Sequence, residues 1–192
     1  MREAVRTRRM IRSYDPDRCV PRELLDELLA LAVRAPSAGH TQGWQFVVLE
    51  SADARARFWA ATSEREPDAW LARMRTAPAL VLCLADKQAY LDRYAQPDKG
   101  WTDRDEARWP VPYWDVDAGM AAMILLLAAT DAGLGACFFG VPPGRHDAVR
   151  AQFGLAGLRL VGVVSLGFPA PDMRSPSLRR GRRPLADVVR FV

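Results

Sequence analysis

One segment, Asp115 to Ala132 (DVDAGMAAMILLLAATDA), constrains the fold more than any other part of the chain. It has the length and composition of a helix, and apolar residues almost encircle it. Either Asp115 or Asp117 could cap its first turn. Such a helix must be buried on most sides, in the centre of the core or along the seam of a homodimer, and we expect both. Small residues such as Gly119 and Ala122 would let a neighbouring element approach closely.

The length of 192 residues suits a single domain, 1–192, that can bury a core without disulfides or metal ions. Its hydrophobic fraction of 49% and charged fraction of 26% are those of a soluble globular protein. The longest apolar run, Gly119 to Thr130, is too short to cross a bilayer, and the N-terminus lacks the apolar centre of a signal peptide. We therefore expect a cytoplasmic protein without a membrane partner.

Cysteine and histidine usage argues against disulfides and metal sites. The three cysteines, Cys19, Cys83 and Cys137, form no CxxC pair, and their number is odd. The two histidines, His40 and His146, belong to no HExxH or Cys/His spacing, so no metal is expected.

The net charge of +4 comes with arginines that gather near both termini instead of along one helix face. This distribution does not predict a nucleic-acid partner. A few of these arginines could instead converge on one anionic group, because the guanidinium fork suits phosphate.

Apolar patterning predicts the remaining elements. A helix begins at Pro21 and ends before Pro36, since proline disfavours helical geometry in the residue ahead of it. Short apolar runs predict strands at 45–49, 79–85, 136–139 and 160–166, and further helices are expected at 3–9, 52–63, 69–75, 87–94 and 144–153. Residues 95–114 have no clear period and are expected to form a variable lid or substrate-pocket region. Strands and helices mix without regular βαβ spacing, which favours an α+β fold.

Common catalytic and nucleotide motifs are missing from the sequence. The segment GLGACFFG does not fit GxGxxG, no P-loop is present, and no GxSxG elbow surrounds Ser37. Neither histidine has a recognisable acid partner. A cofactor enzyme remains attractive, because such a protein needs only to position and tune a borrowed reactive group.

Four blocks together resemble the FMN-dependent nitroreductase family. They are RRMIRSY at Arg8–Tyr14, APSAGHTQGWQF at Ala35–Phe46, DAGLGACFFG at Asp131–Gly140 and RRGRRPLADVV at Arg179–Val189, in the family's order and spanning nearly the whole chain. The resemblance implies a homodimer of three-layer α/β/α sandwiches, each with a mixed central sheet and a long buried central helix. It also implies FMN at the subunit interface, bound by both chains.

The resemblance assigns a role to individual residues. Arg8 matches the phosphate-binding arginine of the family, and Arg12 matches the basic residue near flavin N1 and O2. The backbone at Phe139 and Gly140 would pass the flavin, with an N–H near N5, while the polar bend at 35–46 would come from the other subunit. The cofactor-binding set is Arg8, Arg9, Met10, Arg12, Pro36, Ser37, Ala38, His40, Gln42, Phe139, Gly140, Arg180 and Arg182. In the variable region, Trp109 and Tyr113 are expected to line the substrate pocket.

Several positions depart from the family's pattern. Met10 stands where a small polar residue is usual, His40 where asparagine is usual, and Gly43 where proline is usual. Met123 and Ile124 replace a polar pair that is often found on the central helix.

The activity that the resemblance implies is ping-pong reduction. NAD(P)H would deliver hydride to FMN N5 and leave, and a nitroaromatic, quinone or similar electrophile would then be reduced in the same cleft. No side chain is expected to be a catalytic acid or base, since solvent can supply protons. Two alternatives stay open: an FMN-dependent oxidase or flavin–oxygen chemistry on a specialised metabolite, and a non-catalytic flavin-binding protein.

Overall fold

A computed structural model describes residues 1–62, 68–173 and 175–192. Its central sheet contains β1 (Trp44–Leu49), β2 (Ala79–Ala85), β3 (Gly135–Phe139) and β4 (Arg159–Gly167), in the order β1-β2-β4-β3. All three strand pairs are antiparallel. A mixed sheet was predicted. Among the described residues, the only parallel pairing is the bridge between Met10 and Ala136, so the sheet is mixed only through this bridge.

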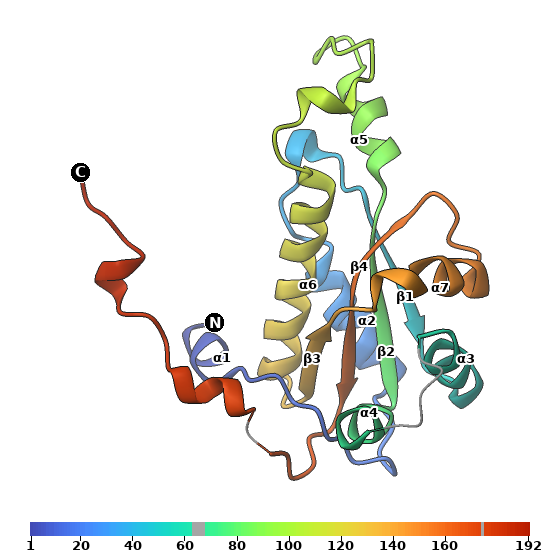
Figure 1. Cartoon of the computed structure of the whole chain (residues 1–192), viewed down its shortest axis with the longest axis vertical. Helices are drawn as coiled ribbons and strands as arrows, with labels where there is room; N and C mark the ends of the chain where they lie inside the picture. Colours follow the sequence, from blue (N-terminus) through green and yellow to red (C-terminus); the bar gives the residue numbers. More distant parts are fainter. Residues whose placement is uncertain (63–67, 174) are drawn as a thin grey trace.

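Helices cover both faces of this sheet (Figure 1). On one face lie α2 (Arg22–Ala32) and α6 (Tyr113–Asp131), and on the other lie α3 (Ala52–Thr62), α4 (Ala69–Met74) and α7 (His146–Phe153). The short α1 (Arg2–Thr7) packs beside α6, and α5 (Lys87–Tyr94) follows β2. The α/β/α layering confirms the predicted fold class.

Strand β2 explains why its sequence is apolar without alternation. Leu80, Leu82 and Leu84 pack into the core layer beneath α3, α4 and α7, while Val81 and Cys83 pack beneath α2 and α6. Successive side chains of a strand point to opposite faces, so a strand covered on both faces is apolar at every position.

Helix α6 begins at Tyr113, two residues before the predicted segment, and Pro112 at its N-cap makes no side-chain capping bond. The expectation that Asp115 or Asp117 caps the helix is therefore wrong, because both lie within it. The helix is long and apolar enough, with a mean hydropathy of 1.3, to cross a membrane by composition. Its packing against α2 and the sheet accounts for that character instead. One side of α6 faces outward, where the side chains of Val116 and Met123 are 40% and 41% exposed.

Most predicted boundaries agree with the structure to within two residues. The predicted helix at 144–153 divides into a 3-10 turn, Pro143–Arg145, and α7. The helix predicted at 52–63 is α3, and residue 63 lies outside the described residues. Within the variable region, a 3-10 turn at Glu106–Arg108 precedes the first turn of α6.

After β4 the chain leaves the body of the molecule as an extended C-terminal arm (Figure 1). The arm contains two short 3-10 turns, Pro176–Arg180 and Leu185–Asp187. Large apolar side chains are exposed along it, with Leu178 at 64%, Leu185 at 70% and Phe191 at 91%. Apolar residues in this number on an arm are expected to be covered by another surface.

Candidate cofactor site

The polar bend before β1 has an unusual backbone. A 3-10 turn, Ala38–His40, contains Gly39 at φ 60°, and two residues that are not glycine, His40 and Gln42, also have positive φ values of 53° and 54°. Ser37 Oγ accepts a hydrogen bond from the Gln42 backbone N–H at 2.9 Å. Positive φ is uncommon outside glycine and gathers at functional sites, so the strained turn supports a binding role for this bend.

The side chains of the bend divide between inward and outward positions. Pro36, His40 and Gln42 are exposed, and Gln42 Nε2 lies 3.0 Å from His40 Nε2. Ala38 faces inward and packs against the buried rings of Tyr90 and Trp114.

Asp117, a buried residue of α6, holds the bend in place. Its Oδ2 accepts from the Ala38 N–H at 2.8 Å and from Tyr90 Oη at 2.7 Å. Burial and this bond to Asp117 raise the pKa of Tyr90 above its ordinary value. Gly43 makes the arrangement possible, since a Cβ there would lie 2.4 Å from Tyr90 Cε2. The glycine that departs from the family's pattern thus leaves room for the tyrosine ring.

The N-terminal arginine segment runs beside β3. Met10 pairs with Ala136, the Ile11 N–H donates to the Ala136 carbonyl at 2.9 Å, and the Phe138 N–H donates to Met10 Sδ at 3.4 Å. This pairing brings the segment at residues 8–12 close to Phe139 and Gly140 at the end of the strand.

An acidic residue from the start of the arm joins the arginine segment. Asp172 Oδ2 accepts from the Arg12 backbone N–H at 2.9 Å, while Arg12 Nη1 donates to the Met10 carbonyl at 3.1 Å. Burial raises the pKa of the neighbouring Cys137 thiol, and the charges of Arg12 and Arg8 oppose that rise. The two guanidinium groups therefore act on the same small region, whereas Arg9 is exposed.

Buried polar atoms without partners mark this region as incomplete. Among the described residues, Arg8 Nη1, Arg73 Nε and Asp172 Oδ1 are buried and have no hydrogen-bond partner. Arg73 Nη1 lies 3.9 Å from Met173 Sδ, next to Asp172 in the chain. Since buried donors are normally satisfied, two unpaired guanidinium donors fit a ligand that is anionic and rich in acceptor atoms.

Arg73 and Asp172 were not predicted from the sequence. Arg73 is a basic residue in the last turn of the short helix α4. Nothing in its local sequence distinguishes it from a solvated arginine. Asp172 depends on the path of the arm. Only the packing of distant segments identifies either residue as part of the site.

The end of β3 opens onto a cavity of about 170 Å³. The Phe139 ring stacks on Trp59, with ring centroids 5.7 Å apart, and meets Trp70 edge-on at 6.0 Å. Apart from the neighbouring residues in the chain, no heavy atom of the described residues lies within 4 Å of where a Gly140 Cβ would be, so the backbone there is approachable. The cavity is lined by Trp59, Thr62, Asp68, Trp70, Leu71, Phe139, Gly140, Val141 and Pro142. Flat apolar walls beside an open backbone suit the edge of a planar ring.

The predicted pocket residues, Trp109 and Tyr113, do not line this cavity and lie just before and at the start of α6. Trp109 is half-buried in a cluster of rings, with centroids 4.5 Å from Tyr94 and 6.0 Å from both Tyr90 and Tyr113. Tyr113 is 40% exposed at the start of α6. These rings lie against the polar bend, because Ala38 packs on the same cluster.

One chain does not bring the predicted site together. The bend is tied to Asp117 near the start of α6, whereas the arginine segment pairs with β3, which follows the end of that helix. The fourteen residue-to-residue steps from Asp117 to Asp131 span about 21 Å at a rise of 1.5 Å each. Arg180 and Arg182 lie on the exposed arm (Figure 1). The predicted residues thus form three groups in one chain. In the described residues no group of three or more His, Cys, Asp or Glu side chains could hold a metal ion.

Comparisons with known proteins identify a family and several relatives. A family model described as the nitroreductase family matches residues 5–168. A protein of Methanothermobacter thermautotrophicus with the provisional name NADH dehydrogenase/NAD(P)H nitroreductase is 31% identical over 175 residues, covering 88% of this chain and 78% of that protein. An NADH dehydrogenase of Thermus thermophilus is 32% identical over 186 residues, covering 86% and 84%. A solved structure from Desulfovibrio desulfuricans, provisionally named a nitroreductase and bound to FMN, has a TM-score of 0.72 and 27% identity, covering 97% and 93%.

Proposed function

The chain belongs to the nitroreductase family, and from this membership we propose that it is an FMN-dependent enzyme that uses NAD(P)H to reduce nitroaromatic, quinone or similar electrophilic acceptors. The observation that carries the proposal is the pair of buried, unpaired guanidinium donors of Arg8 and Arg73. Arg8 belongs to the segment that pairs with β3, the strand that leads to the approachable backbone at Gly140. When bound, FMN supplies the hydride and electron chemistry, in a ping-pong sequence in which NAD(P)H and the acceptor use the same cleft.

The arginines would hold the anionic and oxygen-rich parts of the cofactor. Arg8, joined by Arg180 and Arg182 of the arm, would bind phosphate through charge-assisted hydrogen bonds. Arg12 and Arg73 would place positive charge beside the pyrimidine edge of the ring, and such charge favours uptake of electrons there. The Phe139–Gly140 backbone would lie along the ring, since glycine allows close approach.

A homodimer would complete the site. The bend with Ser37, Ala38 and Gln42 is tied to Asp117 near the start of α6, whereas the arginine segment pairs with β3 beyond the end of that helix. The bend beside a given cofactor would therefore come from a second copy. The outward apolar side of α6 and the exposed apolar residues of the arm support this assembly, because each would be covered in a dimer. Trp109 and Tyr113, which lie against the bend, would then approach the cofactor of the partner and form a wall of the acceptor pocket.

Purified protein tests the proposal through its visible spectrum and an FMN titration. A flavin band, or binding of added FMN in a dimer by sedimentation, is expected, and no binding would refute the proposal. Arg182→Glu should weaken FMN binding at least about tenfold, since a charge-assisted hydrogen bond is worth about 1.5–3 kcal/mol. Arg179→Glu, on the same exposed arm, serves as the control and should leave the FMN dissociation constant unchanged. Equal effects of the two substitutions would remove Arg182 from the phosphate site.

A further inference from the structure

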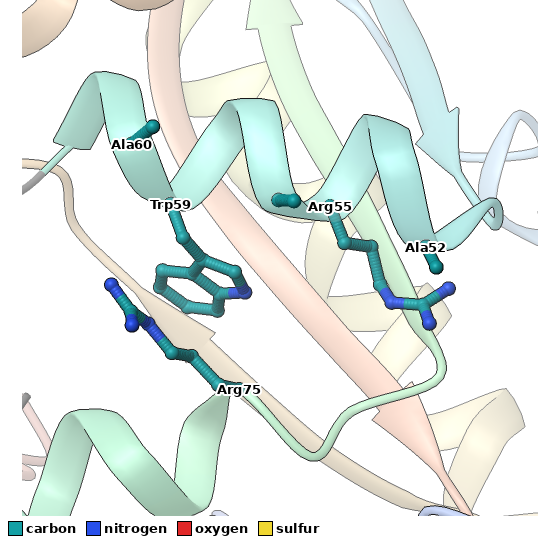
Figure 2. Close-up of a pocket in the computed structure, with 6 residues that line it drawn as sticks. Ala52, Arg55, Trp59, Ala60 and Arg75 are labelled. Carbon is teal, nitrogen blue, oxygen red and sulfur yellow. The ribbon is translucent and has the colours of Figure 1, made fainter.

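A groove lies along α3, beside the end of α4 (Figure 2). Its lining differs from that of the cavity at Gly140. Its volume is about 410 Å³, within the range of small-molecule sites. It is lined by Ala52, Arg55, Ala56, Trp59, Ala60 and Arg75. The two surfaces share one residue, Trp59, whose ring stacks on Phe139 of the cavity.

Two arginines give this groove a positive charge, and no carboxylate side chain is among its lining residues. Arg55 is fixed, because its Nη1 donates to the Pro78 carbonyl at 2.7 Å and to the Glu50 carbonyl. An arginine has five N–H donors, so Arg55 keeps further donors for an acceptor. Arg75 is exposed at the end of α4. Figure 2 shows the two guanidinium groups on opposite sides of Trp59.

The wall between the two charges is apolar and contains one unpaired donor. The methyl groups of Ala52, Ala56 and Ala60 follow one side of α3 at helical spacing. Trp59 is only 6% exposed, and its Nε1 has no hydrogen-bond partner among the described residues. In Figure 2 this nitrogen is on the edge of the indole that faces Arg55. A buried donor of this kind costs free energy unless an acceptor reaches it.

We propose that the groove between α3 and the end of α4 binds an elongated organic dianion with an apolar middle. One acidic group pairs with Arg55 and accepts from Trp59 Nε1, the apolar middle lies along the alanine side of α3, and the second acidic group pairs with Arg75. A bound phosphate or chloride would meet the charges and leave the alanine wall uncovered. An uncharged aromatic molecule would cover the wall and leave both guanidinium groups without acceptors.

The test is a calorimetric titration of the purified full-length protein with 2,6-naphthalenedicarboxylate. Saturable binding of one molecule per chain is expected, and naphthalene-2-carboxylate should bind about tenfold more weakly because it lacks the second charge. Ala56→Leu, which fills the groove, and Arg75→Glu, which reverses one charge, should each weaken binding at least about tenfold. Both positions are exposed, so neither substitution disturbs the core.

Arg57→Glu, a charge reversal on α3, is the matched control for Arg75→Glu. Arg57 pairs with Asp53 at 3.0 Å and lies over the Phe153 ring, outside the groove. Its replacement changes the net charge as Arg75→Glu does, and the affinity for the probe should stay unchanged. The proposal fails if the dicarboxylate does not bind, if Ala56→Leu binds it as the parent protein does, or if the control loses as much affinity as Arg75→Glu.

Discussion

Replacing Gly43 with alanine tests whether Tyr90 and Asp117 hold the polar bend. The added Cβ would lie 2.4 Å from Tyr90 Cε2, 2.9 Å from Tyr90 Cδ2 and 3.1 Å from the Asp86 carbonyl oxygen. Gly43 is not among the residues with positive φ, so the conflict is one of space alone. The ring cannot easily yield, because Tyr90 is fully buried and meets Trp109 and Trp114 at centroid distances of 6.0 and 6.3 Å.

The size of the effect follows from two contributions. Overpacking a filled core costs about 1–3 kcal/mol. If the displaced ring loses its 2.7 Å hydrogen bond to Asp117, a buried carboxylate loses one of its two described partners, at a further cost of about 1–3 kcal/mol. The free energy of unfolding should therefore fall by about 2–6 kcal/mol. For a domain of this size, that corresponds to a decrease in Tm of at least about 4 °C.

Urea unfolding of the FMN-free protein measures this change in the free energy of unfolding. An FMN titration measures whether the bend still binds the cofactor. Gly144→Ala is the control, since nothing lies within 4 Å of its added Cβ, and it should change stability by less than about 0.5 kcal/mol. In a Tyr90→Leu background the cost of Gly43→Ala should shrink, because the opposing ring is absent. A Gly43→Ala protein within 0.5 kcal/mol of the parent, or costs that simply add in the double variant, would refute the reasoning.

Two other predictions concern the arginine segment and the thiols. Arg73→Gln should weaken FMN binding at least about tenfold in a fluorescence titration, because the buried Nε of Arg73 is an unused donor. Arg22→Gln is the control and should leave FMN binding unchanged, since Arg22 is exposed and paired with Asp26. Equal dissociation constants for the two variants would exclude Arg73 from the site. At pH 8 a thiol reagent should modify Cys19 alone in the native protein and all three cysteines after unfolding, since Cys19 is exposed and the other two are buried. Burial raises the pKa of Cys83 to about 12, so the folded chain keeps a proton that the unfolded chain releases above its ordinary pKa of 9.0. Stability should consequently fall as pH rises between these values, by up to about 1.4 kcal/mol per pH unit, and Cys83→Ala should flatten the slope of the unfolding free energy against pH.

The sequence predicted those features that depend on local pattern. Strand β2 and helix α5 have the predicted bounds, because a continuous apolar run and an amphipathic turn are readable from neighbouring residues alone. Asp117 was one of two aspartates that could have capped the helix, which is the usual role of an aspartate near the start of a helix. Its true partners, the Ala38 N–H and Tyr90 Oη, lie 79 and 27 residues away and could not be inferred from spacing.

The candidate site was predictable only as a set of residues and not as a geometry. The family resemblance selected Arg8 and Gly140, and the pairing of Met10 with Ala136 then explains why these distant segments lie together. Arg73 carries no local signal that separates it from the other arginines of the chain. Its importance is visible only because folding buries the Nε atom without giving it an acceptor.

Three of the residues that depart from the family's pattern, Met10, Gly43 and His40, make contacts within the same chain that suit the residue present. Met10 receives the Phe138 N–H on its sulfur at 3.4 Å, and Gly43 leaves the space that the Tyr90 ring fills. His40, which replaces an amide, still makes a hydrogen bond with the Gln42 side chain at 3.0 Å. Each of these changes is matched within the same chain.

Met123 has no such match, because its side chain is 41% exposed on the outward side of α6. An apolar residue at a usually polar position is stabilising only if another surface removes it from water. We therefore expect that surface to come from the second copy, whose helix or arm would have to be apolar at the point of contact. The side of α6 that one chain leaves uncovered thus supports the same assembly that we propose for the cofactor site.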